Sequence, residues 1–148
     1  MNKTHLTQVK FADLPLEKSL ISGLTKQGYE FCTPIQALSL PITLLGKDIA
    51  GQAQTGTGKT LAFLPAVFQY LLVNKVPENR RKNQPRAIIL APTRELAMQV
   101  AEAIESFGKH MKGLRVATLY GGQSYGPQFQ QLERGAQVVV GTPGRLMD

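Results

Sequence analysis

Residues 53–60 read Ala-Gln-Thr-Gly-Thr-Gly-Lys-Thr and follow a short apolar stretch of the chain. Glycines at this spacing let successive backbone N–H groups turn toward phosphate oxygens without a clash from a Cβ atom. Lys59 can reach the terminal phosphates of a nucleotide, and the Thr60 hydroxyl can bind Mg²⁺. The pattern is that of a phosphate-binding loop, although Ala53 stands where the first glycine is usual. The alternative is a Gly-rich turn that binds nothing.

The segments on both sides of this loop alternate between strand and helix patterns. Short apolar runs predict strands at 48–53, 86–91, 115–119 and 137–140. Apolar residues at helical spacing predict helices at 15–26, 34–45, 58–73, 93–107 and 127–133, with glycines after three of them at 28, 46 and 135. This order predicts an α/β fold, a parallel sheet with helices on both faces. Ligands of such sheets lie beyond the carboxyl ends of the strands, where we expect 53–60, 92–97, 121–122 and 142–145.

The composition limits the partners and the compartment. The 148 residues are 43% hydrophobic and hold 17 Lys and Arg against 10 Asp and Glu, a formal net charge of +7. This excess favours a polyanionic partner, with nucleic acid ahead of an acidic membrane surface. The single cysteine, Cys32, excludes an intrachain disulfide and a multi-cysteine zinc site, and it fits a reducing cytoplasm. No signal peptide is visible, and the most apolar run, 61–73, is too short to span a bilayer.

Five stretches resemble, in their usual order, the motif series of the DEAD-box RNA helicases, and they cover essentially the whole chain. They are Gly-Tyr-Glu-Phe-Cys-Thr-Pro-Ile-Gln at 28–36, the loop at 53–60, Pro-Thr-Arg-Glu-Leu-Ala at 92–97, Gly-Gly at 121–122 and Thr-Pro-Gly-Arg at 142–145. Residues 3–7, the context of Phe11 and the basic stretch 74–86 resemble one bacterial subgroup of these helicases. The resemblance implies a RecA-like P-loop NTPase domain, ATP and Mg²⁺ as cofactors, and RNA as a partner.

The resemblance assigns the adenine side of the nucleotide site to Phe11, Tyr29 and Gln36. Tyr29 would stack on the base, and the Gln36 carboxamide offers the paired donor and acceptor that the adenine edge requires. Thr33-Pro-Ile-Gln36 is also a capping box, and Phe11 alone is equally a core anchor for the N-terminal segment. The nucleotide-binding set that the resemblance implies is Phe11, Tyr29, Gln36, Gln54, Thr55, Gly56, Thr57, Gly58, Lys59 and Thr60, with Lys59 and Thr60 also catalytic and Thr60 on Mg²⁺.

The remaining motifs resemble the set that faces RNA in this family. Arg94 and Arg145 would contact phosphates, beside the backbone near Gly122 and the hydroxyl of Thr142. Arginine suits bidentate phosphate binding, and backbone contacts carry no base sequence, so binding should tolerate any sequence. The alternative for Thr93 and Thr142 is a helix cap, which is favoured for each residue taken singly, and the alternative for Gly121–Gly122 is a tight turn.

The stretch 74–86 has five basic residues, one acidic residue and two prolines, which predicts an exposed loop. It is either an RNA-backbone contact or a solvated connector, and charge runs usually serve as the latter.

The chain contains no adjacent Asp–Glu pair. The resemblance places the family's Asp-Glu-Ala-Asp motif, its Ser-Ala-Thr motif and a second RecA-like domain beyond Asp148. We therefore expect 1–12 to be an N-terminal extension and 13–148 to be the N-terminal part of a truncated, incomplete first RecA-like domain. The sheet should be open in its middle, which would expose the apolar faces of 88–90 and 138–140.

An ATPase of this kind needs an acid for Mg²⁺, a group that orients water and an arginine for the transition state. The 148 residues alone are therefore predicted to be inactive, while the intact parent would be a cytoplasmic ATP-dependent RNA helicase that unwinds short duplexes. The subgroup resemblance also implies an RNA-degradation complex as a partner. The alternatives are a nucleotide- and RNA-binding module without turnover and an unrelated P-loop NTPase.

Overall fold

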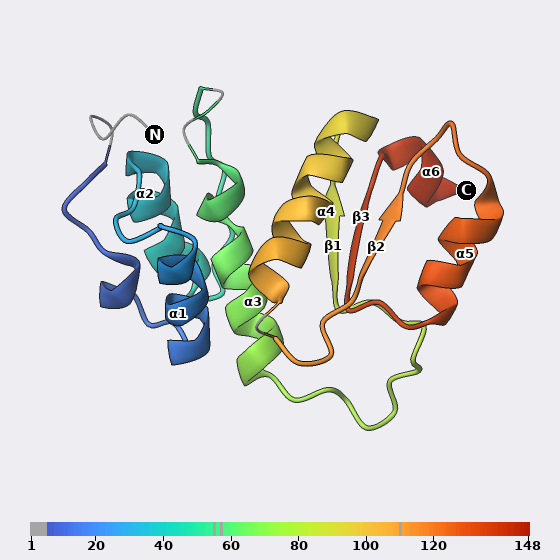
Figure 1. Ribbon diagram of the computed structural model, residues 1–148, viewed down its shortest axis with the longest axis horizontal. Coiled ribbons are helices and arrows are strands. Elements are labelled where there is room, and N and C mark those ends of the chain that lie inside the picture. The colour runs from blue at the N-terminus through green and yellow to red at the C-terminus, as the bar shows by residue number, and fades with distance from the viewer. Residues whose placement is uncertain (1–5, 55, 57, 110) are drawn as a thin grey trace. The chain divides into compact units, whose positions relative to one another are not determined.

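The computed structural model describes residues 6–54, 56, 58–109 and 111–148 (Figure 1). The chain divides into two compact units, one up to Lys75 and one from Val76 to Asp148. Among the described residues, none of the helices has the length and apolar character needed to cross a membrane.

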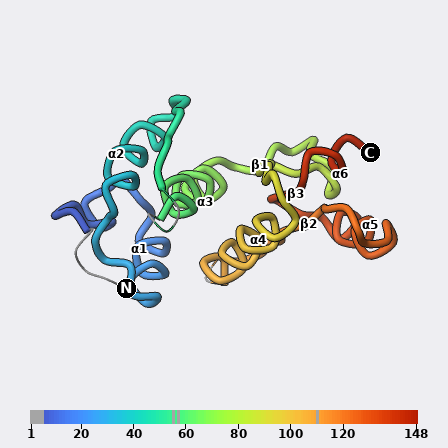
Figure 2. Tube along the Cα trace, turned by 90° about the horizontal axis from the view of Figure 1, so that it is seen from above, coloured from blue at the N-terminus to red at the C-terminus, as the bar shows by residue number. Residues whose placement is uncertain are grey.

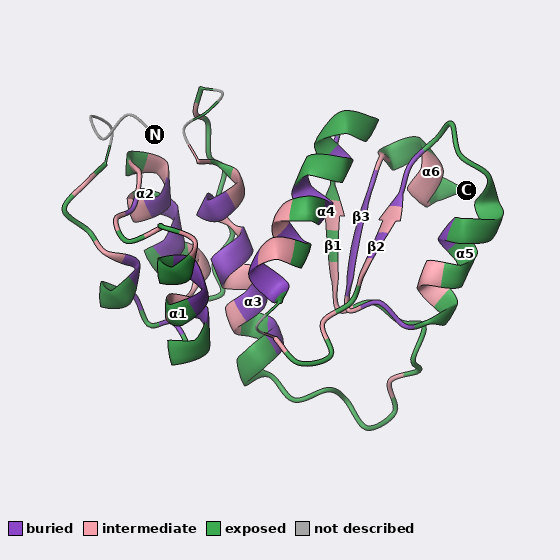
Figure 3. Ribbon diagram, viewed as in Figure 1, coloured by how far each residue is buried: buried purple, intermediate pink, exposed green. Residues whose placement is uncertain are grey.

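The first unit is helical. Its helices are α1 (Lys18–Lys26), α2 (Pro34–Thr43) and α3 (Leu64–Val73), with 3₁₀ turns η2 (Phe11–Asp13) and η3 (Thr60–Ala62). Buried and exposed positions alternate along these helices, as expected for amphipathic segments around a shared core (Figure 3). The most buried apolar side chains of the unit are Phe11, Leu20, Leu24, Cys32, Leu40, Leu64 and Phe68.

Glycine and proline set the helix ends of this unit much as the sequence predicts. Gly28 and Gly46 follow α1 and α2 with φ of 84° and 74°, the left-handed region in which a glycine pays no Cβ penalty. Pro34 begins α2, where its missing N–H costs nothing. Pro41 lies inside the same helix, which ends at Thr43, two residues before the predicted end.

Two predictions for the first unit are wrong. Residues 48–53 form no strand, and among the described residues none pairs with them; a strand exists only as part of a hydrogen-bonded ladder. The predicted helix 58–73 is two elements, because the chain leaves helical geometry at Phe63, with φ of −127°, before α3. Pro65 has no N–H with which to continue a helix from the preceding turn, so it stands in the first turn of a new one.

The second unit is a three-layer α/β arrangement. Strands β1 (Ala87–Leu90), β2 (Val116–Leu119) and β3 (Val138–Gly141) are parallel in the order β1-β3-β2, with Val138 in register with both Ala87 and Val116. Helices α4 (Arg94–Gly108) and α5 (Tyr125–Glu133) lie on opposite sides of the strands in Figure 2. Helix α6 (Pro143–Met147) follows β3. The expected α/β class with a parallel sheet and helices on both faces is confirmed, whereas the described residues contain three strands rather than four.

The core of this unit depends on the central position of β3. Val138, Val139 and Val140 are 0%, 3% and 0% exposed, so the prediction that they present an open face is wrong. Strands pair with both edges of β3, and helices lie on both sides of the sheet. Ile88 and Leu90 of β1 are 62% and 64% exposed, as an open sheet predicts and contrary to a fully buried strand. One core cluster joins Ala117, Leu119 and Val139 of the sheet with Ala136, Leu132 of α5 and Leu146 of α6.

The helix predictions for this unit hold with small shifts. Helix α4 begins one residue after the predicted start, and its stripe buries Val100, Ile104 and Phe107 but leaves Leu96 at 37% exposure. Helix α5 begins two residues earlier than predicted, at Tyr125, and Gly135 follows it with φ of 86°. Helix α6 was not predicted, although Pro143 marks its first turn.

Candidate nucleotide and phosphate-backbone sites

The phosphate loop has left-handed glycines and a lysine that folds back onto it. Gly56 and Gly58 have φ of 79° and 81°, a conformation that side chains with a Cβ rarely adopt, while Thr55 and Thr57 lie outside the described residues. The Lys59 ammonium donates a hydrogen bond of 2.6 Å to the carbonyl of Ala53 at the start of the loop. Thr60 begins the turn η3 and is half-buried. The arrangement holds a positive charge over the loop, where a phosphate group would be attracted.

The start of α3 changes one part of the expected chemistry. Helix α3 begins at Leu64, and a 3₁₀ turn separates it from Gly58. The positive end of an α-helix therefore does not directly follow the glycines, as a helix from Gly58 would have provided. Backbone N–H groups of the loop and of the turn η3 remain the donors suited to a phosphate.

Gln36 connects the predicted adenine motif to the phosphate loop. It is 2% exposed; its Oε1 accepts a hydrogen bond of 2.9 Å from Thr33 N, and its Nε2 donates one of 3.0 Å to the Gly58 carbonyl. A Cβ atom added to Gly58 would lie 2.5 Å from Nε2, so only glycine allows this approach. The contact with Thr33 N confirms the helix-capping alternative for Gln36. Both ends of the carboxamide bind backbone groups, which aligns it beside the loop.

The other two predicted adenine residues have different surroundings. Tyr29 is half-buried, directly after the left-handed Gly28, and its N–H donates to Leu24 O at 2.9 Å. Phe11 is 1% exposed, and its N–H donates to Glu30 O at 3.0 Å, which ties the N-terminal segment to the adenine motif. The burial of Phe11 fits the alternative of a core anchor, and its role toward adenine stays a prediction.

Cys32 is a packing residue of the same motif. Its side chain is fully buried, and this burial, with a smaller contribution from the charge of Asp13, raises the pKa of the thiol to about 11. The thiol is therefore protonated at neutral pH and is a poor nucleophile.

The carboxyl ends of β2 and β3 bring the second group of predicted residues together. Thr142 N donates to Leu119 O at 2.9 Å, which joins the ends of the two strands. Gly122 has φ of 83°, and a Cβ atom added there would lie 3.0 Å from Nη1 of Arg94. The guanidinium of Arg94 thus lies against the backbone of the turn that follows β2, while its ion pair with Glu95 spans 3.5 Å between exposed side chains.

The two threonines considered as caps differ. The Thr93 hydroxyl accepts a hydrogen bond of 3.2 Å from Leu96 N, which confirms its capping role at the start of α4. Thr142 occupies the corresponding position before α6, but within the described part of the chain its hydroxyl forms no capping hydrogen bond. Its hydroxyl is therefore not committed to the helix.

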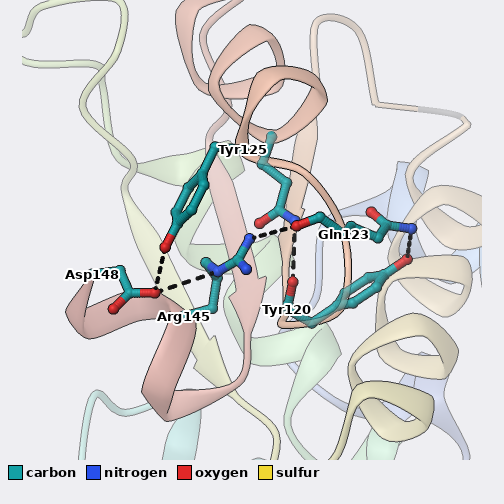
Figure 4. A network of polar contacts seen from close by, with 6 residues as sticks. Tyr120, Gln123, Tyr125, Arg145 and Asp148 are labelled. Atoms are coloured by element: carbon teal, nitrogen blue, oxygen red, sulfur yellow. Dashed lines mark hydrogen bonds and ion pairs between the residues drawn. The ribbon is translucent and has the colours of Figure 1, made fainter.

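Arg145 lies in a network of aromatic, carbonyl and carboxylate partners (Figure 4). Its Nη1 donates to Gln123 O at 3.2 Å, its Nε lies 3.5 Å from Asp148 Oδ2, and its guanidinium carbon is 4.2 Å from the ring centroid of Tyr125. The Arg145 side chain is only 12% exposed. The ring and the two oxygen partners therefore orient the guanidinium before any ligand binds.

Tyr125 and Asp148 are linked to each other as well as to Arg145. The Tyr125 hydroxyl donates a hydrogen bond of 2.9 Å to Asp148 Oδ2. This bond, and then the negative charge of Asp148, raise the pKa of the Tyr125 phenol above its ordinary value, while the charge of Arg145 acts in the opposite direction. The phenol is therefore protonated at neutral pH and keeps its role as the donor.

The turn between β2 and α5 is held by a second pair of hydrogen bonds. Gln123 Nε2 donates to the Tyr120 hydroxyl at 2.7 Å, and the buried Gln128 donates to the Tyr120 carbonyl at 3.0 Å. Sequence reasoning missed Tyr120, Gln123, Tyr125, Gln128 and Asp148. The one sequence signal was an aromatic residue, Tyr125, three positions after Gly122. Nothing near it in the sequence indicates that Arg145, 20 positions later, stacks on its ring.

The predicted residues form two sets, one in each unit. In the first unit Gln36 meets Gly58 and Lys59 meets Ala53. In the second unit two guanidinium groups approach the turn at Gly122 and Gln123. Guanidinium groups match phosphate oxygens, and the role of these two toward RNA stays a prediction. The described residues include no group of three or more His, Cys, Asp or Glu suited to hold a metal ion. The Thr60 hydroxyl is the Mg²⁺ ligand that the loop pattern predicts, and this role stays a prediction.

Comparisons with known proteins point to one family. A family model described as DEAD/DEAH box helicase matches residues 33–148. A protein of Psychromonas ingrahamii described as ATP-dependent RNA helicase RhlB is 70% identical over all 148 residues, which cover 35% of that relative. A Shewanella protein (strain ANA-3) of the same description is 57% identical over 148 residues, or 34% of its length. The chain thus spans about a third of the length of these relatives.

The fold has a solved counterpart. The crystal structure of a DEAD box protein from the hyperthermophile Methanococcus jannaschii is similar with a TM-score of 0.80 and 41% sequence identity. The similarity covers 94% of this chain and 36% of that one. The RecA-like architecture expected from the motifs is therefore confirmed.

Proposed function

The chain belongs to the DEAD/DEAH box helicase family, and we propose that it is the ATP-binding and RNA-backbone-binding portion of an ATP-dependent RNA helicase. The family resemblance drawn from the five motifs is confirmed, and the relatives' names agree with the finer resemblance, to the RhlB subgroup. In the full-length protein, meaning the natural polypeptide that contains these 148 residues, this portion supports local separation of short RNA duplexes.

The contact between Gln36 and Gly58 is the main observation in support of nucleotide binding. It joins the residue proposed to read the adenine edge to the loop proposed to hold the phosphates, within one compact unit. On nucleotide binding, Nε2 or Oε1 exchanges a backbone partner for the base, and Lys59 leaves the Ala53 carbonyl for the phosphates. The Thr60 hydroxyl would hold Mg²⁺ when the nucleotide is bound, and the ion would supply positive charge beside the phosphates.

The RNA half rests on the two arginines at the carboxyl ends of the strands. Arg94 and Arg145 approach the same turn from α4 and α6. Their charges suit phosphate oxygens, with the Thr142 hydroxyl as a neutral donor beside them. The surface should therefore bind RNA of any sequence.

A second candidate is a nucleotide- and RNA-binding module without turnover. It is favoured for the 148 residues by themselves, because they contain no adjacent Asp–Glu pair that could hold Mg²⁺ from the protein side. The two candidates differ in phosphate release and agree in binding. We further propose a cytoplasmic location and association with an RNA-degradation complex, on the strength of the RhlB resemblance alone.

Adenine preference is the first expected result. ADP should displace a fluorescent adenine nucleotide from the full-length protein at roughly 5- to 150-fold lower concentration than GDP or CDP, because a wrong base leaves buried polar groups unpaired at a cost of about 1–3 kcal/mol. Gln36→Ala should remove most of this preference, whereas Gln27→Ala, outside the motif, should keep it. Equal displacement by the three nucleotides would contradict the assignment of Gln36 to adenine.

A further inference from the structure

The amino ends of the three strands collect basic residues that the motif series does not include. They are Arg80, Lys82, Arg86, Arg115 and Arg134, here called the amino-end cluster. In Figure 1 the loop that leads into β1 runs below the amino ends of the strands, whereas the turn that joins β2 to α5 lies at their other end. The cluster therefore lies at the other end of the unit from Arg94 and Arg145.

The loop before β1 is attached to the chain that leads into β3. Nη2 of Arg80 donates to Ala136 O at 3.3 Å, and Arg86 N donates to Gln137 O at 2.8 Å. Gly135, with φ of 86°, allows the closest approach, because a Cβ atom there would lie 2.8 Å from the Lys82 carbonyl. These contacts place three basic residues beside residues 135–137, Arg80 through its side chain and Lys82 and Arg86 through their backbone.

The other two cations reach the same place from β2 and α5. Arg115 N donates to Gln137 Oε1 at 2.8 Å, and Gln137 N donates to Arg115 O at 3.0 Å. The Arg115 guanidinium donates through Nη1 to the carbonyl of Arg134. Five basic residues, three from the loop before β1 and two from the chain beside β2 and α5, thus lie at or beside residues 134–137.

Four cations of the cluster, Arg80, Lys82, Arg115 and Arg134, form no ion pair with a carboxylate among the described residues. The ion pairs Lys10–Glu30, Arg94–Glu95 and Arg145–Asp148 do not involve them. Lys82, Arg115 and Arg134 are exposed. Like charges held close together repel one another, so the cluster gains stability from an anionic partner.

We propose that the amino-end cluster is a second RNA site, which binds a further segment of the sugar–phosphate backbone. Four of its five cations are arginines, whose planar donors match phosphate oxygens. The stretch 74–86 contains no aromatic residue on which a base could stack, which favours contact with the sugar–phosphate backbone. The choice of RNA as the anion rests on the proposed function. The charge and geometry of the cluster are independent of that function.

The test compares two double variants of the full-length protein with equal loss of charge. Lys82→Gln/Arg134→Gln removes exposed cations of the cluster, and Lys18→Gln/Lys26→Gln removes exposed cations of α1. Binding of a single-stranded RNA of about 20 nucleotides is measured by fluorescence anisotropy between 0.05 and 0.3 M KCl, with an RNA of about 6 nucleotides as the short comparison. Thermal unfolding checks that both variants are folded.

The cluster variant should bind the long RNA about 25-fold more weakly at 0.1 M salt, since each phosphate contact contributes about fivefold there. Its salt slope should fall by about 1.4, and its affinity for the short RNA should match wild type. Equal affinity of the cluster variant and the α1 variant for the long RNA overturns the proposal. If the wild type binds neither RNA, the proposed function itself fails. Binding of a polyglutamate peptide that the cluster substitutions abolish, with RNA binding unchanged, assigns the cluster to an acidic protein segment and overturns it too.

Discussion

Replacing Lys59 by Ala in the full-length protein is expected to lower RNA-stimulated ATP turnover by about 10²-fold or more, the usual effect of removing one preorganised donor from a transition state. The ammonium already lies over the phosphate loop, 2.6 Å from the Ala53 carbonyl, and is the one described cation of this loop. The substitution removes a positive charge beside the phosphoryl group that is transferred, where negative charge is redistributed during the reaction.

Lys47→Ala is the matched control for this measurement. Lys47 is an exposed lysine of the same unit, and it follows the left-handed Gly46 outside the loop. Its removal lowers the net charge equally and should leave turnover unchanged. Turnover of Lys59→Ala at the level of Lys47→Ala would show that the loop does not act on ATP.

Replacing Arg145 by Ala should weaken RNA binding of the full-length protein by about 10- to 150-fold, because a hydrogen bond to a charged group contributes about 1.5–3 kcal/mol. Tyr125, the Gln123 carbonyl and Asp148 already orient the guanidinium, so its side chain loses little conformational entropy when RNA binds. The loss should be similar for unrelated RNA sequences, and the salt slope should fall by about 0.7, as for one phosphate contact on a single strand. Arg94→Ala should act in the same direction and less strongly, since that side chain is 53% exposed.

Variants of the partners of Arg145 separate contact from orientation. Tyr125→Ala removes the ring under the guanidinium and should weaken RNA binding by about 2- to 30-fold, whereas Tyr125→Phe keeps the ring and should stay close to wild type. Asp148→Asn removes the carboxylate that competes with a phosphate for Arg145, and should strengthen binding. A change in sequence preference without a change in salt slope would contradict the backbone-contact assignment for Arg145.

The elements that sequence predicted best are those whose ends are marked by local chemistry. Pro34 at the start of α2, Gly28 and Gly46 after two helices, and Thr93 before α4 each act through their own backbone geometry or a nearby hydrogen bond. Such signals lie within a few residues of the feature they mark. These signals can therefore be recognised in the sequence without knowledge of the rest of the fold.

The failures concern features that depend on partners distant in the sequence. The apolar stretch 48–53 forms no strand, because a strand is a property of a pair. The burial of Val138–Val140 follows from the central place of β3, which no local pattern specifies. The stacking of Tyr125 on Arg145 joins residues that only the return of β3 brings together. The contact between Gln36 and Gly58 is also distant in sequence, but it joins two motifs that the family resemblance assigns to the same nucleotide.

ATP turnover by the full-length protein is expected to depend on RNA and to be indifferent to the RNA sequence. Phosphate release by the full-length protein, measured without RNA and with two unrelated single-stranded RNAs of equal length, tests this most directly, since it requires both proposed sites in one reaction. The expected result is slow release without RNA and a rise by the same factor with either RNA. Release at the same rate with and without RNA would contradict the assignment of this chain to an ATP-dependent RNA helicase.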